Sequence, residues 1–231
     1  PGPDSAPIES ARGAEGDPIE LTASSDGPLA AFVFKTTADA FVGKLSYFRV
    51  YSGEFKSNQP VWNSDKKEQE RIAQVVVSQG KNHENIDVLP AGDIGAVAKL
   101  SLTSTGDTLT TREAGISFPG LEFPEPIFSV AVQPKTKVDT DKLGSSLARL
   151  LDEDPSLRID RESDTHEVIL SGLGDAHVDV AVQKLARKFG VEVEVGTPKV
   201  PYKESIRITK RAEYKHKKQT GGHGQYGHVV I

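Results

Sequence analysis

The chain has 231 residues, 36% hydrophobic and 26% charged, a balance typical of one or two globular domains. It contains no cysteine, which excludes disulfides, thiolate metal sites and cysteine nucleophiles. No apolar run approaches the ~18 residues of a transmembrane helix, and no basic segment followed by an apolar one opens the chain, so we expect neither a membrane span nor a signal peptide. Because methionine is absent and the chain opens with Pro1-Gly2-Pro3, we expect it to be part of a longer protein.

The net charge of −5 is unevenly distributed along the chain. Residues 203–218 hold seven Lys and Arg against two Glu, a net charge of +5, and residues 219–231 add none, so residues 1–202 carry −10. A basic segment on an acidic body indicates a local anionic partner such as nucleic acid. A strand whose lysines simply face solvent has the same composition, and charge alone leaves both interpretations open.

The first part of the chain divides into a lead-in and a strand-rich region. Residues 1–27 are rich in Pro, Gly, Ser, Ala and acidic residues without a period of 2 or 3.6, which predicts an irregular linker. Short apolar runs separated by turns then predict strands at 31–34, 44–51, 60–63, 71–78 and 95–100. Residues 28–120 are therefore predicted to form a small closed β-barrel, which leaves no sheet edge exposed.

Residues 121–198 alternate strand and helix patterns. The strands are predicted at 127–132, 157–160, 167–170 and 191–195. Asp139 or Thr140 is predicted to cap a first helix that Pro155 ends, and Gly190 to end a second helix. The apolar faces of the two helices are Leu143, Leu147, Leu150 and Leu151, and Val178, Val182, Leu185, Ala186 and Phe189. The order β-α-β-β-α-β predicts a ferredoxin-like α+β domain.

From Lys199 a further unit begins, with a polar strand or ribbon predicted over 203–218 and a strand over 228–231. Between them, residues 219–227 hold four glycines and predict a glycine-rich turn. Glycines let a partner approach the backbone closely. Amide side chains and backbone N–H groups can bind phosphates, riboses and base edges. The neighbouring lysines supply salt-dependent attraction to nucleic acid. A flexible hairpin tip without a partner is an equally good interpretation of the spacing.

Other candidate sites favour simpler explanations. The dipeptide Gly43-Lys44 lacks the Ser or Thr and the first glycine of a P-loop, and it suits the entry to a barrel strand. The run 104–109 predicts a β-turn in which the Asp107 side chain bonds its own backbone, rather than a phosphate or metal loop. His177 lies beside two aspartates but no nucleophile, which favours a surface histidine at a helix start. Without thiolates, the scattered histidines predict no metal site.

Several segments, taken in order, resemble the elongation factor G family, most closely its elongation-factor-G-like bacterial paralogues. The similarity runs from about Gly27 to the last residue. The matching segments are 27–32, 41–53 (FVGKLSYFRVYSG), 91–98 (AGDIGAVA), 105–109 (TGDTL), 123–126, 134–137, 153–155, 171–174 and 219–231 (QTGGHGQYGHVVI). Each is weak alone, but their common order is specific.

The resemblance implies a multidomain fold. Residues 1–27 would connect to a GTPase domain lying before residue 1, and residues 28–120 would be the translation-factor β-barrel, which contacts ribosomal RNA. Residues 121–198 would be the ferredoxin-like third domain, and 199–231 the truncated start of a fourth, ribosomal-protein-like α/β domain. In the family, the tip of that domain enters the decoding centre and holds the tRNA–mRNA duplex during translocation.

The resemblance also implies the site, the partners and the cofactors. The candidate RNA- and ribosome-binding residues are Lys215, Lys217, Lys218, Gln219, Thr220, Gly221, Gly222, His223, Gly224 and Gln225, with the lysines on phosphates. The partners would be ribosomal RNA, ribosomal proteins, the tRNA–mRNA duplex and the GTPase domain of the same chain, in the cytoplasm and away from membranes. We expect no catalytic or metal-binding residue and no cofactor in this part, whereas GTP and Mg²⁺ would act in the whole protein.

Two positions depart from the family pattern. The usual Gly-Glu-Leu-His-Leu-Glu run reads Gly-Asp-Ala-His-Val-Asp at 174–179, which predicts altered interdomain contacts. His223 replaces a usual Arg, which predicts a weaker or pH-dependent RNA contact. Two alternative functions stay open: a ribosomal protection or rescue GTPase of the same architecture, and a protein-interaction scaffold without an RNA role.

Overall fold

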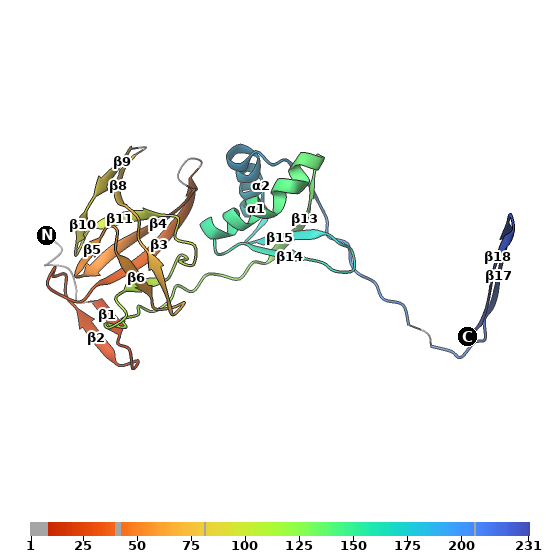
Figure 1. The fold of residues 1–231 in the computed structure, drawn as a ribbon, viewed down its shortest axis with the longest axis horizontal. Helices are drawn as coiled ribbons and strands as arrows, with labels where there is room; N and C mark the ends of the chain where they lie inside the picture. Colours follow the sequence, from red (N-terminus) through yellow and green to blue (C-terminus); the bar gives the residue numbers. More distant parts are fainter. Residues whose placement is uncertain (1–8, 40–42, 81, 206) are drawn as a thin grey trace. The chain divides into compact units, whose positions relative to one another are not determined.

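The computed structural model describes residues 9–39, 43–80, 82–205 and 207–231. It divides into two compact units, Pro1–Lys199 and Val200–Ile231. The first unit contains a β-barrel followed by a ferredoxin-like domain, and the second contains a β-hairpin (Figure 1). The predicted fold class, a barrel followed by an α+β domain, is confirmed. No helix in the described ranges is long and apolar enough to cross a membrane.

The barrel is built on an eight-stranded sheet with the order β7-β6-β12-β3-β4-β11-β8-β9. These strands are β3 Ala30–Asp39, β4 Gly43–Ser52, β6 Pro60–Asn63, β7 Glu68–Arg71, β8 Val75–Gln79, β9 Asn82–Ile86, β11 Ile94–Ala98 and β12 Thr108–Thr110. A separate pair joins β5 Glu54–Lys56 to β10 Val88–Pro90. Three residues connect β7 to β8 and can span at most about 14 Å, so the sheet must curl until these distant strands of the order come close.

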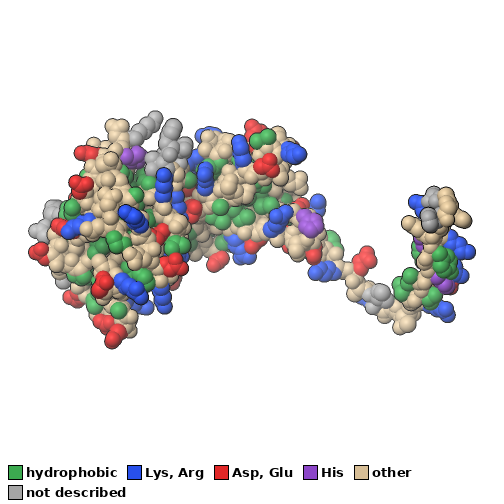
Figure 2. Space-filling model, viewed as in Figure 1, with side chains coloured by type: hydrophobic (Ala, Val, Ile, Leu, Met, Phe, Trp, Pro, Cys, Tyr) green, Lys and Arg blue, Asp and Glu red, His purple; other side chains and the backbone are tan. Residues whose placement is uncertain are grey.

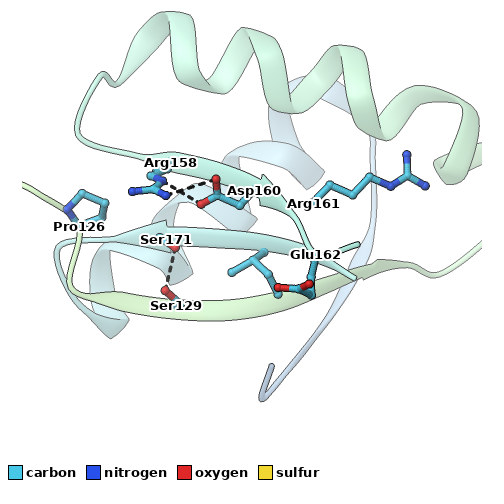
Figure 3. A pocket seen from close by; sticks show the side chains of 8 residues that line it. Pro126, Ser129, Arg158, Asp160, Arg161, Glu162 and Ser171 are labelled. Carbon is cyan, nitrogen blue, oxygen red and sulfur yellow. Dashed lines mark hydrogen bonds and ion pairs between the residues drawn. The ribbon is translucent and has the colours of Figure 1, made fainter. Parts of the chain in front are cut away.

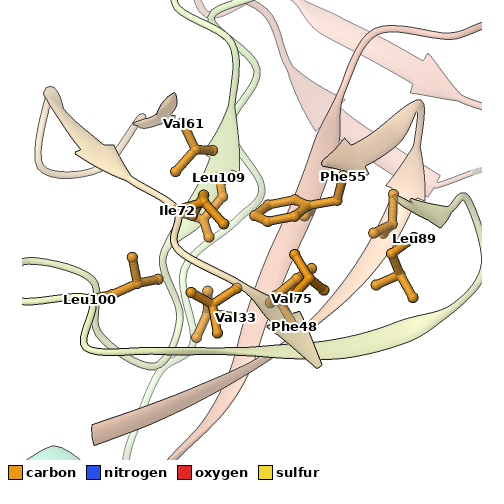
Figure 4. Packing of buried hydrophobic residues seen from close by; sticks show 12 residues of the cluster. Val33, Phe48, Phe55, Val61, Ile72, Val75, Leu89, Leu100 and Leu109 are labelled. Atoms are coloured by element: carbon orange, nitrogen blue, oxygen red, sulfur yellow. The ribbon is translucent and has the colours of Figure 1, made fainter. Parts of the chain in front are cut away.

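The barrel core fills the inside of this curled sheet (Figure 4). In β4 the side chains alternate, with Phe48 and Val50 buried and Tyr47 and Arg49 half-buried on the outer side. Phe48 packs on Phe55 of β5, with ring centroids 4.2 Å apart. The buried cluster draws on strands from both ends of the sheet order: Ala31, Val33, Phe48, Val50, Phe55, Val61, Ile72, Val75, Leu89, Val97, Leu100 and Leu109.

The strand predicted over 71–78 is two strands in the structure. Residues 72–74 belong to neither strand, and in this break Ile72 is buried in the core while its N–H donates to the Gln59 carbonyl at 2.9 Å. The pattern also missed β5, β9, β10 and β12. Strand β9 is polar and mostly exposed, so its residues carry no apolar alternation that could reveal it.

The prediction of an irregular lead-in is wrong for residues 9–21, which form a hairpin of β1 Glu9–Arg12 and β2 Pro18–Leu21. Ala11 and Leu21 are buried beside Ile116. Two backbone hydrogen bonds, of 2.8 and 2.9 Å, join Arg12 to Ser117. Four-residue strands with one or two apolar positions each are too short for a period to show. Residues 1–8 of the predicted lead-in lie outside the described residues.

The ferredoxin-like domain has the predicted element order. Its elements are β13 Phe128–Pro134, α1 Lys137–Glu153, β14 Arg158–Arg161, β15 Val168–Gly172, α2 Asp175–Phe189 and β16 Val193–Gly196. The strands pair antiparallel in the order β14-β15-β13-β16, and both helices cover one face of the sheet (Figure 1). Leu143, Leu147 and Leu150 of α1 pack with Val178 and Leu185 of α2 as predicted, although Ala186 is exposed and Ala181 is buried in its place.

The ends of the helices follow local capping rules. The predicted cap of α1 is wrong, because Thr136 caps the helix in a reciprocal capping box: Asp139 N–H donates to Thr136 Oγ1, and Thr136 N–H donates to the Asp139 carboxylate. The helix ends at Glu153, before Pro155, as predicted. Gly190 adopts a left-handed conformation, φ 64°, at the end of α2, which confirms its predicted role.

The barrel contacts the ferredoxin-like domain at the end of α1. Lys44 Nζ of β4 lies 2.9 Å from Asp152 Oδ1. The backbone N–H of Ala38 in β3 donates to Glu153 Oε1 at 2.6 Å, and Lys188 of α2 contacts the same oxygen. Since the Glu153 side chain is only 7% exposed, its carboxylate needs both partners.

The second unit contains a two-stranded hairpin, β17 Glu213–Thr220 and β18 His223–Val230. The described residues between Val200 and Ala212 form no helix or strand, so the prediction of one ribbon over 203–218 is wrong for residues 203–205 and 207–212, while residue 206 lies outside the described residues. The charged side chains of this segment give it the polar character of an exposed ribbon, but a strand also requires a partner to which its backbone can hydrogen-bond.

Candidate nucleic-acid interface

The candidate interface is the β17–β18 hairpin, which holds all ten residues predicted to bind RNA. Eight consecutive residue pairs join its strands, from Glu213 opposite Val230 to Thr220 opposite His223. The turn is only Gly221-Gly222, and Gly221 has a φ of 70°, which glycine adopts without steric cost. The predicted nine-residue turn is therefore too long, because Gly224 and Gly227 occupy strand positions.

Strand alternation divides the hairpin into two faces, since residues directly opposite one another share a face and neighbours along a strand do not. The Glu213 face consists of Glu213, Lys215, Lys217, Gln219, Gly224, Tyr226, His228 and Val230. The described residues of the Lys218 face are Tyr214, His216, Lys218, Gln225, Gly227 and Val229. The three predicted lysines are thus not on one surface. The side chains of Thr220 and His223 lie outside the described part.

The charged groups of the Glu213 face contact one another. Glu213 Oε1 lies 3.0 Å from Lys215 Nζ and 2.7 Å from His228 Nε2. Nearer the turn, Lys217 Nζ lies 5.9 Å from the centroid of the Tyr226 ring, a cation–π contact. This face combines two ammonium groups, one carboxylate and one aromatic ring in contact with an ammonium group.

Both faces are open to solvent in the second unit. The Tyr214 side chain is 70% exposed and Tyr226 66%, and Figure 2 shows Lys and Arg side chains gathered along the hairpin. Ammonium groups, amides and aromatic rings on an exposed ribbon can bind phosphate oxygens and stack on unpaired bases. A two-stranded hairpin is marginally stable in water by itself, so a bound partner would also stabilise it.

The P-loop-like dipeptide has a structural role. Gly43 opens β4, as predicted, and the Lys44 ammonium is engaged by Asp152. A P-loop requires a glycine-rich loop between a strand and a helix, and here the dipeptide begins a barrel strand. These residues do not fit a nucleotide phosphate.

The predicted Asp107 turn is confirmed. Asp107 Oδ2 accepts from the backbone N–H of Ser104 at 2.8 Å and from Asn63 Nδ2 at 2.9 Å. Asn63 also donates to Thr103, whose own groups donate to the buried Glu70 carboxylate. This network fixes the 101–107 loop against the barrel. Among the described residues, no group of three or more acidic, His or Cys side chains could hold a metal ion.

His177 lies at a helix start as predicted, but it is half-buried and both of its ring nitrogens have partners. Its Nδ1 accepts from the Leu173 N–H at 3.1 Å, so in the neutral ring the proton is on Nε2, which lies 2.9 Å from Asp154 Oδ2. Burial alone would raise the pKa of Asp154, but hydrogen bonds from Ser156 and His177 outweigh it and lower that pKa below its ordinary value. His177 thus joins the start of α2 to the end of α1.

A polar hollow of about 510 Å³ lies on the helix-free face of the ferredoxin-like sheet (Figure 3). Arg158 pairs with Asp160 at 2.8 Å across this surface, and the hydroxyls of Ser129 and Ser171 bond at 2.7 Å. These four side chains already satisfy one another, so they do not define a ligand.

Comparison with known proteins identifies three successive segments. The family models described as elongation factor G domain 2, domain III and domain IV match residues 28–112, 123–197 and 198–231. A crystal structure of a protein from Thermus thermophilus is 37% identical, with a TM-score of 0.68 over 88% of this chain and 31% of that chain. The chain therefore spans about a third of the length of this similar protein.

Proposed function

Because the chain belongs to the elongation factor G family, we propose that it is the ribosome-binding part of a GTP-dependent factor that moves tRNA and mRNA on the ribosome. The observation that carries the proposal is the ordered match to domains 2, III and IV, together with an exposed basic hairpin in the domain IV segment. Its partners would be ribosomal RNA, ribosomal proteins and the tRNA–mRNA duplex, in the cytoplasm.

In this function each part has a separate task. The barrel and the ferredoxin-like domain form one compact unit, which would serve as the rigid base that docks on the ribosome. The hairpin would present ammonium groups to phosphates and amide groups to riboses and base edges. GTP and Mg²⁺ would act in a GTPase domain of the whole protein, since Gly43-Lys44 does not fit a phosphate.

The test is competition with a full-length elongation factor G for ribosomes, measured with labelled factor and increasing amounts of the 231-residue chain. We expect the chain to displace the factor and to slow translocation at saturation. The matched control is the triple variant Lys215→Gln, Lys217→Gln and Lys218→Gln, which should compete less well at each salt concentration.

Three outcomes separate the competing functions. Displacement with slowed translocation supports the proposal. Displacement of the factor only from drug-bound or stalled ribosomes would favour a protection or rescue role. A folded chain that binds no ribosome would leave the scaffold function and contradict the proposal.

A further inference from the structure

The two faces of the hairpin carry the same formal charge but differ in how that charge is used. The Glu213 face has two lysines and one glutamate, and the Lys218 face has one lysine, so each has a net charge of +1 with neutral histidines. Long-range attraction to RNA therefore does not distinguish the faces. A difference in RNA binding between the two faces must therefore come from which side-chain groups are available to a ligand.

On the Glu213 face the charged groups and the Tyr226 ring are engaged within the hairpin. The Glu213 carboxylate holds Lys215 and His228, and it would repel an approaching phosphate. The Lys217 ammonium lies over the Tyr226 ring, and a base could stack on that side of the ring only by displacing the lysine.

On the Lys218 face the binding groups are free. Within the part of the chain that the structure describes, the side chains of Tyr214, His216, Lys218 and Gln225 make no hydrogen bond, ion pair or ring contact. The described residues of this face include no carboxylate. Lys218 and Gln225 are directly opposite, which places an ammonium group beside an amide near the turn.

Glycine leaves additional room on this face. Gly227 is directly opposite His216, and a Cβ added at Gly227 would meet no atom within 4 Å. A nucleotide can therefore approach the backbone beside the imidazole, where a larger cross-strand partner would exclude it.

We propose that the Lys218 face is the RNA-binding face of the hairpin, whereas Lys215 and Lys217 chiefly stabilise its fold. This inference rests on the proposed function. Lys218 binds a phosphate, Gln225 binds a ribose hydroxyl or base edge beside it, and Tyr214 supplies a stacking surface farther from the turn. The three lysines carry the same charge and lie on the same strand, but they have different tasks because strand alternation places them on different faces.

The test compares adjacent lysines that carry the same charge change. Lys218→Gln and Lys217→Gln are each introduced into the full chain, and ribosome co-sedimentation is measured across a salt series. We expect Lys218→Gln to weaken binding about three- to tenfold and to lower the salt slope by about one ion, and Lys217→Gln to stay within about twofold of the parent. Tyr214→Leu and Tyr226→Leu form a second pair, with loss expected only for Tyr214→Leu. Amide hydrogen exchange in 213–230 checks that each hairpin remains paired.

The outcomes distinguish the inference from the function on which it rests. Equal losses for Lys217→Gln and Lys218→Gln, or a loss confined to Lys217→Gln and Tyr226→Leu in paired hairpins, would overturn the choice of face while ribosome binding stands. Unchanged binding in all four variants would also overturn it. A parent chain that fails to bind at the lowest salt would instead remove the proposed function.

Discussion

At the scale of single residues, the contact between His177 and Asp154 shows how one side chain can link two helix ends. Asp154 is the last cap of α1 and also accepts from Ser156, while His177 lies in the first turn of α2. Asp139 and Glu167 likewise have lowered pKa values, chiefly through hydrogen bonds from Thr136 and from the Lys199 backbone. All three carboxyl groups make the ferredoxin-like domain sensitive to acid.

The variant Asp154→Asn tests this pH dependence. A carboxyl whose pKa is lower in the folded state contributes stability above its unfolded pKa of about 4, and that stability is lost as the pH falls through the folded value. Asp154→Asn should therefore reduce the unfolding free energy by about 1–2 kcal/mol at neutral pH and by less in the acid range. Urea unfolding at neutral pH and in the acid range measures these changes in the unfolding free energy. The control Asp141→Asn, an exposed position of α1, should change little, and a deficit for Asp154→Asn that grows on acidification would contradict the account.

From the sequence we could propose candidate RNA-binding residues, but not which of them share a surface. Lys215, Lys217 and Lys218 formed a single group when only charge and spacing were considered. The assignment of faces needs the register, and the register depends on where the turn begins, which four glycines in nine residues obscure. Glu213 contacts both Lys215 and His228 because the register places these two residues opposite one another.

At the scale of elements, the start of α1 depends on Thr136. Its hydroxyl accepts from the N–H of Asp139, which satisfies a helix donor that has no partner within the helix. Thr136→Ala should lower the unfolding free energy by about 1 kcal/mol, measured by far-ultraviolet circular dichroism in urea. Thr140→Ala is the matched control, since the Thr140 hydroxyl bonds only the Thr136 carbonyl. A larger loss at Thr140 would restore the cap originally predicted from the sequence.

In the barrel, Glu70 holds the 101–103 segment. Its carboxylate accepts from the backbone N–H groups of Leu102 and Thr103 at 2.9 and 3.0 Å and is almost fully buried. Glu70→Gln replaces one accepting oxygen with a donor and should cost about 2–3 kcal/mol. The fluorescence of Trp62, the single tryptophan and a residue of β6, reports the unfolding of the barrel. Glu68, an exposed residue of β7 like Glu70 in sequence but not in burial, supplies the control Glu68→Gln. Equal effects of the two exchanges would refute a special role for Glu70.

The predicted elements were correct where burial follows a period and incomplete where it does not. Leu143, Leu147 and Leu150 revealed α1 because one helix face packs on the sheet. Strand β12, Thr108–Thr110, is fully buried, yet two of its three residues are polar and satisfied by hydrogen bonds, so hydrophobicity could not reveal it. The observed cap, Thr136, lies three residues before the predicted Asp139, because an aspartate suits both the cap and the third helical position.

At the scale of the whole molecule, the compact first unit depends on the end of α1. Glu153 accepts from the Ala38 backbone of the barrel and contacts Lys188 of α2, and the neighbouring Asp152 pairs with Lys44. These contacts connect the barrel to both helices of the ferredoxin-like domain.

Replacing Glu153 should uncouple the two domains. In the parent chain we expect the unfolding midpoints from Trp62 fluorescence and from circular dichroism to coincide, because the domains unfold together. Glu153→Gln removes the negative charge that pairs with Lys188 and weakens the hydrogen bond that this side chain accepts from the Ala38 N–H, so the two midpoints should separate. The exposed barrel residue Glu113 provides the control, Glu113→Gln. Coincident midpoints in the Glu153 variant would show that the Glu153 contacts do not couple the domains.

Co-sedimentation of the folded 231-residue chain with purified ribosomes across a salt series is the decisive test of ribosome binding. We expect saturable binding whose affinity falls with increasing salt, because ammonium groups on the hairpin displace counterions from RNA phosphates. A chain that remains folded but does not bind ribosomes even at the lowest salt concentration would contradict the proposed function.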